Sequence, residues 1–74
     1  MRFMISYEGI NKLMQNGTNF NQILNFVYEN YNLKVSEYHM YYIDHEGDAI
    51  TLDSQTDLKI MLENNMKEQI KLYI

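Results

Sequence analysis

Apolar residues recur at two different spacings along this chain, and the order of these spacings constrains the fold more than any other feature. Residues 2–8 alternate between apolar and polar side chains, and residues 69–74 do the same. Between them, residues 20–31 carry apolar side chains three and four positions apart. Period two is typical of β-strands, and a spacing of three and four is typical of an amphipathic helix. The chain therefore predicts strands at both ends and a helix between them.

Turn residues divide the first half of the chain. Gly9 separates the first strand from a second, shorter strand at residues 10–15. Asn16-Gly17 is a turn dipeptide because both residues tolerate positive φ. Thr18 is then the expected N-cap of the helix, and asparagine at position 32 suits the left-handed residue that ends one. The core-facing stripe of this helix is predicted to be Phe20, Ile23, Leu24, Val27, Tyr28 and Tyr31.

The second half of the chain repeats the pattern. Residues 38–43 alternate and predict a third strand, and residues 49–52 predict a short fourth strand after a tight turn at 46–48. Ser54 and Asp57 have the spacing of a capping box, which predicts the start of a second helix. That helix should end at Asn64-Asn65, with its inward side chains being Leu58, Met61 and Leu62.

The predicted order of elements is ββαββαβ. A chain of 74 residues is long enough for one domain and too short for two. We expect an α+β, ubiquitin-like β-grasp fold: a mixed five-stranded sheet with two helices on one face. The last strand is apolar enough to be central and to pair beside the first. Residues 1–74 fill such a fold with little to spare, so we expect a single module taken from a longer protein.

Five acids fall within fourteen residues, and no lysine or arginine interrupts them. They are Asp44, Glu46, Asp48, Asp53 and Asp57, half of the chain's ten carboxylates. Like charges crowded in this way repel one another, and each carboxylate needs a counter-charge or water. Such a surface suits a cation, which could be a metal ion, a substrate or a basic patch on another protein.

Composition excludes several classes of partner. The formal net charge of −4 argues against nucleic acid and against anionic lipid, both of which require a basic face. No stretch approaches the length of apolar sequence that spans a membrane. The chain has no cysteine, so disulfides and thiolate metal sites are excluded. This composition fits a reducing compartment, and we expect a cytoplasmic protein.

Metal and catalytic sites find little support. Counted from Asp44, an EF-hand loop would need glycine at its sixth position and glutamate at its twelfth, but this chain has Gly47 fourth and Gln55 twelfth. His39 and His45 lack a third nitrogen or sulfur ligand. Neither a cysteine nucleophile nor a glycine-rich phosphate loop is present. We therefore expect no enzyme activity, no metal, no cofactor and no small-molecule substrate.

The acidic segment resembles the acidic motif of the Phox/Bem (PB-one) domains, a β-grasp family. Residue types and spacings agree over about seventeen positions, in the strand-turn-strand-helix context of that motif, and the remaining elements follow in the family's order. The resemblance covers essentially the whole chain. It is carried by the pattern Tyr42-x-Asp44-x-Glu46-Gly47-Asp48-x-Ile50-x-Leu52-x-Ser54-x-x-Asp57-Leu58.

The resemblance implies a protein interaction module that scaffolds hetero- or homo-oligomeric signalling complexes. In this family an acidic face binds, front to back, the basic face of another domain of the same type. Gly47 would supply the turn that aims the acids outward. By position, the acidic residues that contact the partner would be Asp44, Glu46, Asp48 and Asp57.

The same resemblance implies a basic face at Arg2 and Lys12, in which case the partner could be a second copy of this chain. Two alternatives stay open. Asp57 could serve only as a helix-capping acid, favoured by the helix dipole. The whole domain could instead be a ubiquitin-like module that binds partners through an apolar sheet surface.

Overall fold

The first and last strands of the chain lie side by side in the middle of one sheet. The computed structural model describes residues 2–15, 19–65 and 68–74. The strand order is β2-β1-β5-β3-β4, with β5 central, parallel to β1 and antiparallel to β3. The elements are β1 (Arg2–Tyr7), β2 (Ile10–Met14), α1 (Phe20–Tyr31), a short 3-10 helix η1 (Val35–Glu37), β3 (Tyr41–Ile43), β4 (Ala49–Thr51), α2 (Gln55–Asn64) and β5 (Gln69–Tyr73).

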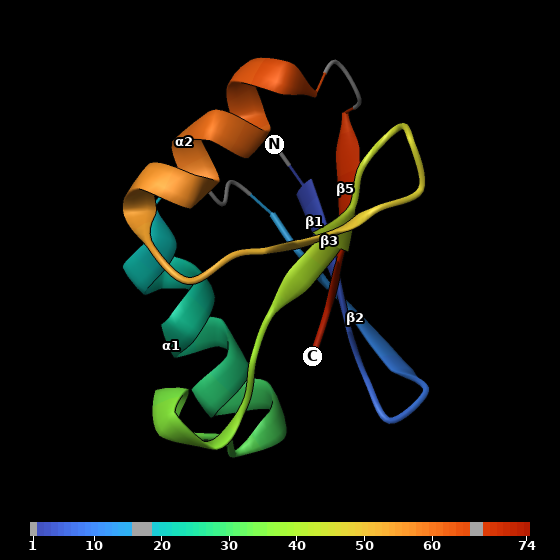
Figure 1. The fold of residues 1–74 in the computed structure, drawn as a ribbon. Helices are drawn as coiled ribbons and strands as arrows, with labels where there is room; N and C mark the ends of the chain where they lie inside the picture. The colour runs from blue at the N-terminus through green and yellow to red at the C-terminus, as the bar shows by residue number, and fades with distance from the viewer. Residues whose placement is uncertain (1, 16–18, 66–67) are drawn as a thin grey trace.

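Both helices cover the same face of the sheet, as Figure 1 shows. The predicted β-grasp order, with a mixed five-stranded sheet and a central last strand, is therefore confirmed. Phe3 and Ile5 of β1 face the helices and are fully buried, and Leu72 of β5 pairs beside Ile5 and is buried with it. From the helices, Ile23, Val27, Leu58 and Met61 complete the middle of the core. Both α-helices of the described residues lie on this face, and the alternate strand residues point to the opposite face of the sheet, called here the uncovered face.

Side chains cap the N-termini of both helices, and a left-handed residue ends α1. The side chain of Asn19 accepts a hydrogen bond from the amide of Asn21 and starts α1. The expected N-cap, Thr18, lies one residue before it and outside the described residues, as does the Asn16-Gly17 dipeptide. Asn32 ends α1 in the left-handed conformation with φ 56°, as predicted. Ser54 caps α2 by accepting from the amide of Asp57.

Two details of the sequence interpretation were wrong. The third strand is shorter than residues 38–43, because pairing with β4 begins only at Tyr41, and Val35–Glu37 form a 3-10 turn before it. Tyr28 was placed on the core-facing stripe of α1, but its side chain is 53% exposed. Phe26 packs against the core instead. Among the described residues, no helix is long and apolar enough to cross a lipid bilayer.

Candidate functional site

The acidic turn, defined here as residues 44–48, joins β3 to β4 and is fixed by its first residue. Oδ1 of Asp44 accepts hydrogen bonds from the amides of Glu46 at 3.0 Å and Asp48 at 2.9 Å. The backbone of Asp44 also donates to the Asp48 carbonyl and accepts from the Gly47 amide. One carboxylate oxygen of Asp44 therefore organises the turn, a role that the sequence pattern did not reveal.

Gly47 gives the turn its shape. Its φ of +86° lies in the left-handed region, which glycine adopts without the cost that a Cβ would bring. No atom lies within 4 Å of the place where a Cβ would sit, so conformation alone, and not crowding, favours glycine here. The sequence predicted a tight turn at residues 46–48, and the left-handed conformation of Gly47 is its structural basis.

Three carboxylates gather on this turn. One oxygen each from Asp44, Glu46 and Asp48 lies within 4.8 Å of the others. Glu46 and Asp48 are exposed and Asp44 is half-buried. In the described part of the chain, Arg2 forms an ion pair with Glu68 at 3.8 Å, and the imidazole of His45 lies 3.8 Å from the Glu46 carboxylate, which it pairs with only when protonated. Across residues 2–15, 19–65 and 68–74, no lysine or arginine therefore forms an ion pair with the turn.

Asp57 lies on the first turn of α2 and forms local contacts. Its Oδ2 accepts from the backbone amide of Asp53 at 3.1 Å, whereas a capping box would use the backbone amide of Ser54. A hydrogen bond between the two carboxyl groups, together with this amide, lowers the pKa of Asp57. The same side-chain hydrogen bond and the negative charge of Asp57 raise the pKa of Asp53. Asp57 thus has a local structural role at the start of α2, and its contact with a partner stays a prediction.

The hydroxyl of Tyr42 is affected by the charges of both the acidic turn and Asp57. It precedes the turn on β3, faces the helices and is nearly buried. Burial raises the pKa of the Tyr42 hydroxyl, and the negative charges of Asp44 and Asp57 raise it further. Both acids therefore lie within electrostatic range of this one phenol. The sequence had placed these two acids thirteen positions apart.

Lys12 faces the helices. It pairs across from Ile5, a core residue, so both side chains lie on the covered face of the sheet. Its Nζ donates to the Asn30 carbonyl at 3.0 Å and lies 5.3 Å from the centre of the Tyr31 ring. The last turn of α1 contains no basic residue, so Lys12 supplies from β2 the cation that favours a helix C-terminus.

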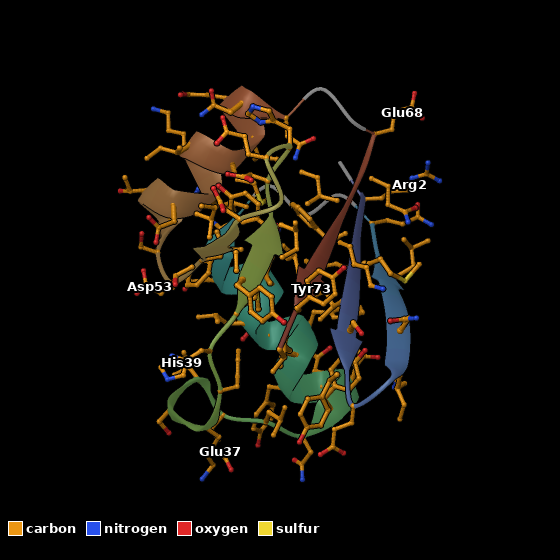
Figure 2. The ribbon with its side chains drawn as sticks, turned by 45° about the vertical axis from the view of Figure 1, so that its right-hand side comes forward. Arg2, Glu37, His39, Asp53, Glu68 and Tyr73 are labelled. Atoms are coloured by element: carbon orange, nitrogen blue, oxygen red, sulfur yellow. The ribbon has the colours of Figure 1, made fainter. Side chains whose placement is uncertain are left out.

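Arg2 lies on the opposite face. It alternates with buried Phe3 and therefore shares the uncovered face with Met4. Figure 2 shows its side chain beside Glu68, at one end of the sheet. The Arg2 side chain is 47% exposed. The structure therefore does not bring Arg2 and Lys12 together, and a basic face built on this pair stays a prediction that the geometry does not favour.

The uncovered face of the sheet is partly apolar. Leu13, Tyr41 and Ile43 alternate with core-facing residues and are 40%, 37% and 44% exposed. Tyr41 stacks on Tyr73 with ring centres 5.2 Å apart, and Tyr73 can be found in Figure 2. Lys71 lies over the Tyr73 ring at 5.1 Å. The alternation of residues 38–43 in the sequence is the signal that could have placed Tyr41 and Ile43 on this face.

Comparison with solved structures supports the fold, whereas comparisons of the sequence with family models and curated proteins find no match. No protein-family model matches the chain, and neither does any curated protein sequence. Among solved structures, the chain is similar to one described as "AtNBR1-PB1 domain", with a TM-score of 0.81 and 15% sequence identity. The similarity covers 99% of this chain and 92% of that one. The chain therefore has the fold of a PB1 domain, which confirms the fold that its acidic motif led us to expect.

Proposed function

We propose that this domain is a protein interaction module whose acidic face docks on a basic face of another domain of the same fold. The acidic face consists of Asp44, Glu46, Asp48 and Asp57. The observation that carries the proposal is the clustering of three carboxylates within 4.8 Å on a turn that its own hydrogen bonds hold in place. The likeness to a PB1 domain supports an interaction module over an enzyme.

Electrostatics explains why such a surface suits a basic partner. Isolated exposed ion pairs stabilise by only about 0–1 kcal/mol, but several carboxylates converging on one cation add their attraction. The turn is fixed before binding, so little conformational entropy is lost when the partner docks. The complementary charges would orient the partner and speed encounter. We expect a cytoplasmic scaffold that acts without a cofactor.

Charge reversal at the two exposed acids tests the proposal. Glu46→Lys with Asp48→Lys should weaken binding to a basic-face Phox/Bem domain by about tenfold or more, measured by calorimetry, while circular dichroism remains that of a folded domain. Both substitutions leave the Asp44 carboxylate in place to cap the turn. Glu8→Lys with Glu29→Lys changes the net charge equally at two other exposed sites and serves as the control. Unchanged binding by the first pair would contradict the proposal.

A second candidate is docking through the uncovered sheet face. The exposed side chains of Leu13, Tyr41 and Ile43 favour it. A partner held there would bind mainly by apolar burial, so its affinity would change little with salt. Docking on the acidic face would weaken as salt rises, because exposed charges are screened within about 8 Å at physiological ionic strength. Binding isotherms at low and high salt separate the two.

A further inference from the structure

β2 lies at an edge of the sheet. Its neighbour on one side is β1, and no strand within residues 2–15, 19–65 and 68–74 pairs with its other side. In Figure 2 it is the outermost blue strand, on the right of the sheet. The helix α1 does not close this edge, because a hollow of about 400 Å³ lies between α1 and β2. The edge is therefore accessible to a further strand.

The hydrogen bonds of β1 show which backbone groups of β2 are unused. The Ser6 carbonyl accepts a hydrogen bond from the amide of Ile74. The Arg2 amide donates to the carbonyl of Glu68. Both bonds run to the β5 side of β1. Because successive residues of a strand direct their amides and carbonyls to opposite sides, even-numbered residues of β1 bond toward β5 and odd-numbered residues bond toward β2.

Two residues of β2 therefore direct their backbone groups away from β1. The odd-numbered residues of β1 pair with Ile10, Lys12 and Met14, so these three bond inward. Asn11 and Leu13 lie between them and direct their amides and carbonyls to the open edge. Backbone groups spaced in this way are what an added strand binds.

β2 also lacks the features that protect an exposed edge from pairing, which are charged side chains, prolines and bulges. The chain contains no proline, and the register of β1 with β2 runs without a bulge. Lys12 is the charged residue of β2, but its ammonium is turned toward α1 and donates to the Asn30 carbonyl. Leu13, by contrast, is 40% exposed. The open edge therefore carries unpaired amides beside an apolar side chain.

The opposite edge of the sheet is better protected. β4 is three residues long, and exposed acids, Asp48 and Asp53, lie before and after it. Two β4 strands brought together would place these like charges near one another. A β4 strand would also offer β2 fewer backbone groups than a second β2 strand does. Of the two edges, β2 is therefore the one suited to pairing with itself.

We propose that β2 pairs antiparallel with β2 of a second copy of this chain, about a two-fold axis at Leu13. Each Leu13 then lies opposite its own copy, and Asn11 lies opposite Gln15. The two leucines bury apolar surface against each other, and the side-chain amides bond across the strands. On the helix side, Lys12 lies opposite Met14, so like charges do not meet. The contact is isologous and closes as a dimer in which the two sheets join.

Other registers of the same pairing are poorer. An axis at Lys12 would place two lysines opposite each other, which is destabilising. An axis at Asn11 would place Leu13 opposite Gly9, in the turn between β1 and β2, where no strand continues. The dimer does not depend on the proposed function, because the acidic turn joins β3 to β4 at the other edge of the sheet.

Sedimentation equilibrium tests the dimer in the Glu46→Lys/Asp48→Lys variant, so that docking by the acidic turn does not contribute. The mass should rise with protein concentration toward that of two copies and no further. Hydrogen exchange followed by NMR then locates the contact. The amides of Asn11 and Leu13 should exchange more slowly as concentration rises, whereas that of Lys12, which bonds within one copy, should change less.

A matched pair of lysine variants tests the axis. Leu13→Lys places two lysines opposite each other and should weaken self-association by about tenfold or more. Ile43→Lys makes the same change in charge on the same uncovered face, at a residue of β3 that is 44% exposed. It should leave self-association unchanged. Circular dichroism checks that both variants are folded.

A pair of proline variants tests the backbone contact. Asn11→Pro removes an amide directed to the open edge, a place where a folded edge strand accepts proline, and should abolish the dimer. The Leu52 amide donates to the Met40 carbonyl, so Thr51 directs its own amide to the open edge of β4. Thr51→Pro should therefore retain the dimer. If Asn11→Pro unfolds, Leu13→Lys provides the test.

Three outcomes would overturn the proposed dimer and leave the proposed function standing. The first is a protein that stays monomeric at every concentration. The second is association that survives both Leu13→Lys and Asn11→Pro, because another surface would then be responsible. The third is a mass above that of two copies, because an isologous contact closes at two. Failure of the proposed function is seen separately, as unchanged partner binding by the Glu46→Lys/Asp48→Lys variant.

Discussion

The amide of Asp48 donates a hydrogen bond to Oδ1 of Asp44 at 2.9 Å, and this contact closes the acidic turn. The residue that begins the turn is therefore both a charge on the acidic face and the structural support of its neighbours. The two functions can be separated, because only one oxygen of Asp44 accepts these amides.

Removing that oxygen should loosen the turn. Asp44→Ala leaves two amides without their acceptor and should lower the free energy of unfolding by about 1 kcal/mol. Asp44→Asn keeps an oxygen at the same place and should cost less, while still removing one negative charge. Urea denaturation of both variants measures the difference. Equal losses of stability would contradict a capping role for the Asp44 side chain.

Gly47 and Gly9 form a natural pair for separating stability from binding. Their φ values are +86° and +80°, and neither has an atom within 4 Å of the place of a Cβ. Alanine at either position should therefore cost a similar free energy of unfolding, about 1 kcal/mol, from backbone conformation alone. Only Gly47→Ala should also weaken partner binding, because Gly9 lies in the β1–β2 turn. If calorimetry shows that both variants bind the partner equally weakly, this view of the turn is contradicted.

The pair Asp53 and Asp57 should titrate at different pH values. The pKa of Asp53 is raised and that of Asp57 is lowered by their shared hydrogen bond. Asp57 therefore stabilises the fold above the unfolded value of 3.8, and this contribution is lost as pH falls through its folded pKa. Asp53 acts in the opposite direction: its ionisation disfavours the fold as pH rises through its raised pKa.

Asp57→Asn tests this coupling. An asparagine can still accept from the Asp53 amide but carries no charge, so the pKa of Asp53 should fall toward its ordinary value. Carboxyl carbon shifts followed by NMR through acid pH measure both groups. An Asp53 pKa that stays unchanged in this variant would show that Asp57 does not perturb it.

Lys12 should matter for stability and not for docking. Lys12→Met keeps the apolar stem but removes the ammonium from the Asn30 carbonyl and from the end of α1. We expect a loss of about 0.5–1 kcal/mol in the free energy of unfolding. Any binding that uses the uncovered sheet face should be unaffected, whereas Arg2→Ala should weaken it. If light scattering shows that the Lys12→Met variant is folded but no longer self-associates, Lys12 belongs to a basic face after all.

Much of the fold could be predicted because apolar residues recur in the sequence at the spacings typical of strands and helices. Alternation identified β1 and β5, and the turn signal at Gly47 identified the acidic loop. What could not be predicted depends on backbone geometry between elements. β3 begins only at Tyr41, where its pairing with β4 starts, and the Asp57 carboxylate accepts from the backbone amide of Asp53 instead of that of Ser54. Arg2 and Lys12 lie on opposite faces of the sheet because the register of the β1–β2 pair places Lys12 across from Ile5.

The central claim is that the acidic turn is a docking surface for a basic partner. Its most direct measurement is the dissociation constant for a basic-face Phox/Bem domain, compared between wild type, the Glu46→Lys/Asp48→Lys variant and the Glu8→Lys/Glu29→Lys control. We predict a loss of affinity on the order of tenfold or more for the first variant only, because like charges would then oppose each other across the interface. Equal affinities for all three proteins would contradict the account.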